Sequence, residues 1–540
     1  MMREIQPGSG SRVPWRQLLL IAALCFGTVV RLLHLGFVGV DTPFHLGGLF
    51  VEFSQQIAAH GFRLPARIPL YTDGGIPFAY PPLPFYLEAF LLSVLSLPKF
   101  TVVNLLPPLI AIMAIHSFYL LTRQLAFDAS AQLFALWAYA TMPVAFQQQI
   151  EGGGLAESVG SLSLIWFAIS LVRARSTRTA AGYAQAGVFW AISVLASPGS
   201  AYASVPTALI LAPPHLGRRV QTTGLLALAG GIAIALTAPY WLTVVMHHGV
   251  RVFTDSFIAQ HVGLVDTLKG FLINTFTFQV SSTRFSLFWN LCVFAGVLWE
   301  VFDGRWWLPV WFSIMFNIPR EGDWLVSAPA ALLAGIGGAR ILQPQFHTLA
   351  RNVSQRPAAK LAACSFVAMV LLFGVVWCPL RVIKGMLQDD EESLSASDLA
   401  AMQWVSANIP PESEFVVLAP PGITEWFPQI ARRTVLNTPF GAEWKPREAE
   451  RINTLDAQLS DCLDWDCVEA TVQRTLGHDG FYLCIAQRQF ARLAAASAGA
   501  RKRFHTMLAR GDIVIGDLVA VDSPSSMRDT DRNEPATNDP

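Results

Sequence analysis

The residues best suited to chemistry begin with a carboxylate and an imidazole four positions apart, Asp41 and His45, in the segment 40–45. Pro43 favours the start of a helix, which would bring the two side chains close together at its first turn. A pair placed in this way can share a divalent cation, or work as a base and the group that orients it. The alternative is structural: Asp41 also suits the N-cap of that helix, and the local sequence gives the two roles about equal weight.

A second acidic segment, 147–157, holds three successive glycines between Glu151 and Glu157. Glycines allow the backbone to approach a ligand closely. Glu157 stands at the start of the next apolar run, where an acid stabilises a helix N-terminus, so we interpret it as structural. Glu151 is the better functional candidate, although the whole segment also reads as a flexible turn.

Basic and aromatic side chains gather in segments 38–101, 246–284 and 319–324. Guanidinium and imidazole groups suit an anionic head group such as phosphate, and each residue taken singly fits a solvated loop equally well. The candidates for substrate binding are His45, Arg63, Tyr80, His247, His248, Arg251 and Arg320, and those for a divalent cation are Asp41 and His45.

The composition places these loops in a membrane protein. Of the 540 residues, 53% are hydrophobic and only 14% are charged, whereas soluble chains carry roughly 25% charged residues. Lys plus Arg and Asp plus Glu both number 38, so the net charge is zero. A nucleic-acid partner is therefore not expected. The sequence predicts a polytopic α-helical membrane protein.

Hydropathy and charge predict about eleven crossings, since a bilayer core of about 30 Å needs about 20 apolar residues per helix. The first run, Leu18 to Leu35, follows several arginines and is interpreted as a retained span, with residues 1–16 cytoplasmic. The membrane domain covers 17–380. Its expected spans are 18–35, 102–122, 130–147, 158–173, 181–197, 200–214, 222–245, 285–301, 306–318, 324–341 and 361–380.

The apolar run 82–97 is excluded from that count. If it also crossed, the cluster Arg173 to Arg178 would face outward, against the positive-inside rule. The run begins Pro81-Pro82-Leu83-Pro84 and contains Glu88, so we interpret it as lying in the interface. The external loops are then 38–101, 147–157 and 246–284.

The chain changes character after Leu380. Residues 381–521 predict a small extracytoplasmic α/β domain, with a strand at Glu414 to Leu418 and a helix at Ala449 to Asp461. Residues 522–540 have the composition of a disordered tail. Cys462 and Cys467 can close a short loop in an oxidising compartment, or they can remain free thiols, since Cys484 makes the local count odd.

The succession of motifs resembles the GT-C fold glycosyltransferases: protein O-mannosyltransferases, lipid A aminoarabinose transferases and the catalytic subunit of oligosaccharyltransferase, and it is nearest to uncharacterised prokaryotic members. The resemblance covers the membrane half, above all residues 17–175. Its motifs are an Arg31/His34 turn, Asp41, Tyr80-Pro-Pro-Leu83, Leu120 to Leu125, Met142-Pro143 and the acidic second loop, with 425–428 and 438–444 in the tail.

The resemblance implies transfer of a sugar from a polyprenyl-phosphate donor to a glycan, lipid or protein acceptor on the external face, with inversion. It makes Asp41 a base or metal ligand and Glu151 an assisting acid. Arg251, Arg320 and the pair His247-His248 would hold the lipid phosphate. The chain departs from the mannosyltransferase Asp-Glu pair, and it lacks the Asp-x-Asp and Trp-Trp-Asp-Tyr-Gly motifs of oligosaccharyltransferases. N-glycan transfer is therefore not expected, and the need for a divalent cation stays open.

The expected protein is an integral, multi-pass protein of the plasma (inner) membrane, surrounded by membrane lipid. Two other classes compete with the enzyme. A transporter or flippase of lipid-linked sugars predicts internal repeats and mid-span charges, and the sequence shows no such repeat. A non-catalytic scaffold for the tail domain predicts that Asp41 and Glu151 are dispensable.

Overall fold

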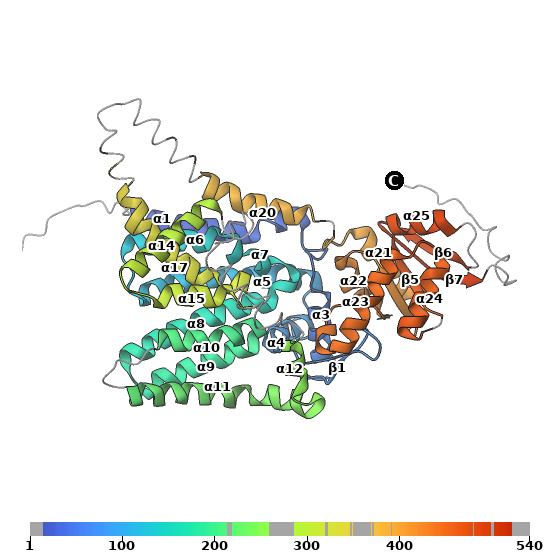
Figure 1. Cartoon of the computed structure of the whole chain (residues 1–540), viewed down its shortest axis with the longest axis horizontal. Helices are drawn as coiled ribbons and strands as arrows, with labels where there is room; N and C mark the ends of the chain where they lie inside the picture. Colours follow the sequence, from blue (N-terminus) through green and yellow to red (C-terminus); the bar gives the residue numbers. More distant parts are fainter. Residues whose placement is uncertain are drawn as a thin grey trace, which may run out of the picture. The chain divides into compact units, whose positions relative to one another are not determined.

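The computed structural model describes residues 15–212, 219–258, 286–318, 322–345, 372–389, 391–478, 480–497 and 502–520, with the single residues 348, 351, 365 and 369. The chain forms two compact units (Figure 1). Unit 1 comprises Met1–Phe44, Tyr80–Thr243 and Gln260–Asp389, and unit 2 comprises His45–Ala79, Val244–Ala259 and Asp390–Pro540. Parts of the expected external loops 38–101 and 246–284 therefore belong to the same unit as the sequence after residue 389.

Unit 1 is helical. Its elements are α1 Trp15–Leu32, α2 Leu35–Val38, α4 Leu83–Ala89, η1 Phe90–Val94, α5 Lys99–Gln124, α6 Ala129–Thr141, η2 Pro143–Ala145, α7 Gln147–Ile150, η3 Gly152–Gly154, α8 Leu155–Thr177, α9 Ala180–Ala196, α10 Pro198–Leu211, α11 Arg219–His248 (which runs on into unit 2), α14 Leu287–Phe302, α15 Trp307–Phe316, α16 Gly322–Leu325, α17 Ser327–Gly337, η5 Gly338–Leu342, η6 Leu372–Trp377 and α20 Cys378–Leu387.

Two groups of packed helices make the core of unit 1. Helix α8 packs against α5, α9 and α10, and α17 packs against α6 and α14. Small residues allow the second group to approach closely: a Cβ added at Gly296 of α14 would lie 2.0 Å from the carbonyl oxygen of Leu333 in α17. Close backbone approach through small residues is typical of helices packed in membranes.

Five helices in the described part of the chain are long and apolar enough to cross a membrane: Trp15–Val38, Lys99–Gln124, Gly152–Thr177, Gln221–His248 and Gly322–Gln345. Shorter apolar helices cover Leu83–Val94, Ala180–Ala196, Leu287–Phe302 and Trp307–Phe316. The chain is a helical membrane protein, while the count of about eleven crossings and the interfacial position of 82–97 stay predictions. Within the last expected span, 361–380, residues 361–364, 366–368, 370 and 371 lie outside the described residues.

Unit 2 mixes helices and strands. Its elements are α3 Gly48–Ala59, β1 Arg67–Ile68, β2 Ile76–Pro77, α12 Arg251–Ile258, α21 Ala396–Asn408, β3 Glu414–Leu418, α22 Pro421–Ala431, β4 Thr434–Val435, η7 Ala442–Trp444, α23 Pro446–Asp461, α24 Trp465–Leu476, β5 Tyr482–Ala486, α25 Gln487–Ala496, β6 Lys502–Arg510 and β7 Ile513–Ala520. The predicted strand at 414–418 is confirmed, as is the helix at 449–461, which begins three residues earlier.

A five-stranded sheet of order β4-β3-β5-β7-β6 organises unit 2. Strands β4, β3 and β5 run parallel, and β7 and β6 are antiparallel. Four of the five residues of β3 are buried, as expected of a parallel strand covered on both faces. Cys462 and Cys467 form a disulfide between α23 and α24, while Cys484 is a buried free thiol.

Candidate functional site

Asp41 lies in an irregular segment that α5 holds in place. Its side chain is exposed. The buried amide of Asn104 donates from Nδ2 to the carbonyl oxygen of Thr42 at 2.7 Å, and its Oδ1 accepts from the backbone N–H of Phe44 at 3.0 Å. One side chain therefore fixes the backbone that follows Asp41 without using the carboxylate.

The helix expected at Pro43 begins five residues later, at Gly48, with Gly47 as its N-cap. Asp41 is therefore not an N-cap, and the helical spacing argued for Asp41 and His45 is wrong. His45 and Gly47 have φ values of 61° and 151°, and these positive angles do not continue a right-handed helix.

The segment that carries Glu151 is joined to the segment that carries Asp41. Within unit 1, the N–H of Gly152 donates to the carbonyl oxygen of Phe44 at 2.9 Å. Gly154 is required by the same turn, since a Cβ there would lie 1.9 Å from the carbonyl oxygen of Gln148. Glu151 is partly buried. Glu157 lies in the first turn of α8, the place expected of a structural acid.

The Arg31/His34 turn supports both segments. The guanidinium of Arg31 is buried, and it donates to the carbonyl oxygens of Ala145 at 2.8 Å and Ala140 at 3.2 Å. A cation at the carboxyl end of α6 is favourable, because the carbonyl groups there carry partial negative charge. The ring of His34 stacks on Phe44, with centroids 4.7 Å apart. Arg31 thus fixes the turn that precedes Glu151. His34 packs on Phe44, whose carbonyl oxygen accepts the hydrogen bond from Gly152.

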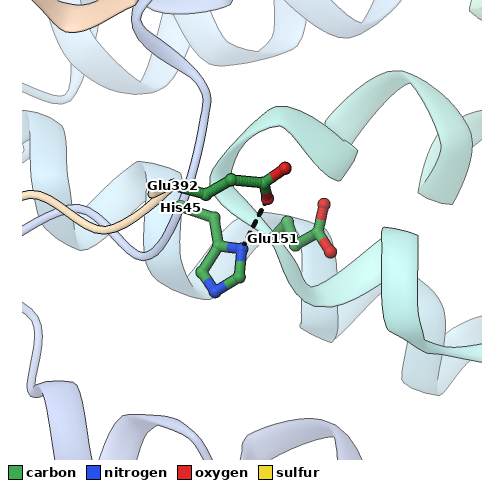
Figure 2. A group of neighbouring side chains, drawn as sticks. All are labelled: His45, Glu151 and Glu392. Atoms are coloured by element: carbon green, nitrogen blue, oxygen red, sulfur yellow. Dashed lines mark hydrogen bonds and ion pairs between the residues drawn. The ribbon is translucent and has the colours of Figure 1, made fainter. Parts of the chain in front are cut away.

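In unit 2, the His45 ring is fixed by Glu392. Nδ1 of His45 lies 3.0 Å from Oε2 of Glu392 (Figure 2), and the His45 side chain is 2% exposed. The backbone is held as well, since Nε1 of Trp426 donates to the His45 carbonyl oxygen at 2.9 Å. Glu392 was not among the residues predicted to act in the site. The available signal was the acidic run 389–392, which lies a short distance after the last apolar stretch.

A buried carboxylate caps the helix after His45. Glu425 of α22 accepts from the N–H of Gly47 at 2.6 Å through Oε2 and from the N–H of Leu49 at 3.4 Å through Oε1. Burial raises the pKa of Glu425 to about 7, and nearby Glu392 acts in the same direction, against the hydrogen bonds from the helix N-terminus. The tail motif at 425–428 thus positions the first-loop helix α3.

A second link joins α22 to α3. Nη1 of Arg432, directly after α22, lies 2.6 Å from Oε2 of Glu52, which is fully buried. The amide of Gln56 also donates to Glu52 Oε1 at 2.7 Å. These bonds satisfy a carboxylate that would otherwise be costly to bury.

The structure brings together some of the predicted substrate-binding residues. Nε2 of His248 donates to the carbonyl oxygen of Ala66 at 2.7 Å, which connects the segment of Arg63 with that of Arg251 inside unit 2. Arg63, His247 and Arg251 are exposed. Tyr80 belongs to unit 1, where its ring packs edge-on against Phe85. Arg320 lies outside the described residues.

A further histidine of unit 2 lies between two carboxylates. Nδ1 of His478 is 2.7 Å from Oε2 of Glu414, and its Nε2 is 3.6 Å from Oδ2 of Asp73. Because both ring nitrogens face carboxylates, we interpret this arrangement as a polar link between the 67–77 hairpin and the sheet.

No protein-family model and no curated protein matches the sequence. Solved structures do match. The archaeal oligosaccharyltransferase AglB from Archaeoglobus fulgidus, in complex with an inhibitory peptide and a dolichol-phosphate, is 14% identical, with a TM-score of 0.62 over 93% of this chain and 74% of that chain. ArnT from Cupriavidus metallidurans, bound to undecaprenyl phosphate, is 14% identical, with a TM-score of 0.53 over 94% of this chain and 98% of that chain.

The arabinofuranosyltransferase AftD from Mycobacteria is also similar, at 14% identity and a TM-score of 0.57, over 94% of this chain and 40% of that chain. All three are glycosyltransferases of the GT-C type. At these identities the likeness concerns the fold. The chain is a helical membrane protein with the GT-C fold, as its sequence motifs led us to expect.

Proposed function

We propose that the chain is a membrane glycosyltransferase that moves a sugar from a polyprenyl-phosphate donor to an acceptor at the extracytoplasmic face of the plasma (inner) membrane. The fold supports this class of reaction, because its structural neighbours hold dolichol-phosphate and undecaprenyl phosphate. The observation that carries the proposal is the hydrogen bond from Gly152 to Phe44. It joins the two short segments in which the sequence places the candidate acids, Asp41 and Glu151.

Asp41 acts as the base in this proposal. Its carboxylate takes the proton of an acceptor hydroxyl, and the oxygen attacks the anomeric carbon of the sugar. The bond from that carbon to the phosphate oxygen breaks, and the electron pair leaves with the polyprenyl phosphate. A single displacement inverts the anomeric carbon. An exposed carboxylate on a fixed backbone suits a group that must meet a substrate, and Glu151 assists it.

Cationic and polar side chains bind the donor head group, and they stabilise the charge that develops on the departing phosphate. We assign this role to His45, Arg63, Tyr80, His247, His248, Arg251 and Arg320. The hydrogen bond between His248 and Ala66 supports part of this set, because it holds the segments of Arg63 and Arg251 together.

Asp41 and His45 would hold a divalent cation if the reaction uses one. A carboxylate oxygen and an imidazole nitrogen are donors that zinc and manganese accept. The bond from Glu392 to Nδ1 of His45 is the kind of outer contact that orients metal-binding histidines. A bound cation would supply positive charge to the leaving phosphate. The oligosaccharyltransferase from Archaeoglobus fulgidus has also been solved in complex with Zn and sulfate.

The test is a comparative analysis of glycans and polyprenyl-phosphate sugars in a deletion strain complemented with variants. We expect the deletion to accumulate one lipid-linked sugar and to lose one glycosylated product. The wild-type chain should restore both, and Asp41→Asn should lower product formation at least about 100-fold, as is typical for loss of a general base.

Asp73→Asn is the matched control, since Asp73 is an exposed acid of the same predicted loop, and it should complement like wild type. Full complementation by Asp41→Asn would instead favour the scaffold. If the lipid-linked sugar accumulates only on the cytoplasmic side of the deletion strain, the chain is a flippase.

A further inference from the structure

A cavity of about 520 Å³ lies at one end of unit 1. It is bounded by the carboxyl ends of α5, α8 and α10 and by the start of α15, and its walls include Val172, Arg175, Arg178, Ile210 and Trp307. None of the described residues that line the cavity takes part in the proposed reaction. The cavity is therefore a separate feature of the membrane unit.

The cavity and the candidate acids lie at opposite ends of α8. Glu151 precedes the first residue of α8, and the cavity surrounds its last turns. The helix has 23 residues, which corresponds to about 34 Å at the usual rise. This length matches the hydrocarbon core of a bilayer, about 30 Å. A ligand in the cavity would thus lie at the opposite membrane surface from the segments of Asp41 and Glu151.

Basic side chains mark the same end of the bundle. Arg340 pairs at 2.8 Å with Asp128, the N-cap of α6, which follows α5 closely in the chain. Arg16 donates to Gln132 in the next turn of α6 at 3.3 Å. Excess Arg and Lys at one end of a bundle indicates the cytoplasmic side, where the leaflet is rich in anionic lipids.

The lining of the cavity has two chemically different parts. Arg175 is partly buried, and its Nη1 donates to the carbonyl oxygen of Leu211 at 3.5 Å, while Arg178 is exposed. A guanidinium has five N–H donors in a planar fork that matches phosphate oxygens. Val172, Ile210 and Trp307 add apolar wall, and none of the described residues that line the cavity is acidic.

We propose that this cavity binds the head group and upper acyl chains of one anionic phospholipid of the cytoplasmic leaflet. The arginines would hold the phosphate, and the apolar wall would cover the start of the chains. A soluble phosphate compound would contact only the arginines, whereas a lipid would contact both the arginines and the apolar wall. Trp307, at the start of α15, suits the interfacial position that tryptophan favours in membranes.

The test is native mass spectrometry of the purified full chain, with added phosphatidylglycerol or phosphatidylcholine. We expect one phosphatidylglycerol molecule to bind in preference to phosphatidylcholine. Each arginine that contacts the lipid phosphate inside the cavity should contribute about fivefold in affinity for an anionic lipid. The double variant Arg175→Gln/Arg178→Asn should therefore lose about 25-fold in phosphatidylglycerol binding, and the asparagine tolerates the left-handed φ of 55° at position 178.

Arg173→Gln is the matched control, because Arg173 is an exposed arginine on the same helix that does not line the cavity. It should bind lipid like wild type. Val172→Trp is a second test that fills the cavity without changing its charge, and it should also reduce binding. Thermal unfolding of each variant separates lost binding from lost structure.

Three results would overturn the proposal. Equal loss in Arg173→Gln and in the double variant would mean that the basic end attracts lipid without a site. Unchanged binding in a folded Arg175→Gln/Arg178→Asn double variant would remove the role of the arginines. Displacement of phosphatidylglycerol by millimolar glycerol phosphate would assign the cavity to a soluble phosphate compound.

Discussion

At the scale of single residues, Glu425 shows how a tail motif acts on the first loop. Its carboxylate is buried, yet it accepts hydrogen bonds at the N-terminus of α3, where a negative charge is favourable. Desolvation outweighs that benefit, and the pKa rises from 4.5 to about 7. Glu425 therefore holds a proton in the folded chain over a range of pH in which the unfolded chain has lost it.

This shift predicts a pH-dependent stability with a defined sign. Because the folded state binds the extra proton between about pH 4.5 and 7, the free energy of unfolding contributed by Glu425 falls as pH rises through that window, by about 3 kcal/mol in total. Glu425→Gln removes the titration. We measure the melting temperatures of wild type and Glu425→Gln in detergent from pH 4.5 to 7.5. As pH rises, the melting temperature of the wild type should fall relative to that of Glu425→Gln. A constant difference across the series would contradict the assignment.

At the scale of elements, the position of α3 depends on α22. We expect Arg432→Ala to lower the free energy of unfolding by about 2 kcal/mol, since it leaves the buried Glu52 carboxylate without its cation while Gln56 still donates to it. The same substitution in a Glu52→Gln background should cost less than about 1 kcal/mol, because no buried charge is then left unpaired. Chemical denaturation of the four chains measures this coupling, and additive effects would show that the ion pair is not what links the helices.

Local pattern was sufficient for some of these elements and insufficient for their contacts. The run Glu414 to Leu418 is apolar after its first residue and contains two valines, and it forms β3. The helix at 446–461 likewise follows its periodicity. The start of α3 was misplaced because Pro43 suggested a helix, while the positive φ angles of His45 and Gly47 are set by tertiary contacts. Glu52 and Arg432 are 380 positions apart, a pairing that no short-range pattern reveals.

At the scale of the whole molecule, the distribution of charged residues was enough to predict a topology. It was not enough to predict which buried side chains support the candidate loops. The positive-inside rule assigned the 173–178 cluster to the cytoplasm. In unit 1, Arg340 pairs with Asp128 at the start of α6, and Arg175 lines the cavity at the end of α8. The support given by Asn104 and Arg31 to the candidate loops was not predictable, because buried polar side chains carry no periodic signal.

The topology itself predicts opposite labelling of the two ends of α8. In a chain without Cys25 and Cys378, the remaining free thiols, Cys292 and Cys484, are buried. A cysteine introduced by Asp41→Cys should then react with a membrane-impermeant maleimide in intact cells, because position 41 is exposed at the proposed external face. One introduced by Ser176→Cys, in the last turn of α8, should react only after the membrane is permeabilised. Reaction of both from the same side would contradict a membrane crossing by α8, and with it the separation of the sugar-transfer site from the lipid cavity.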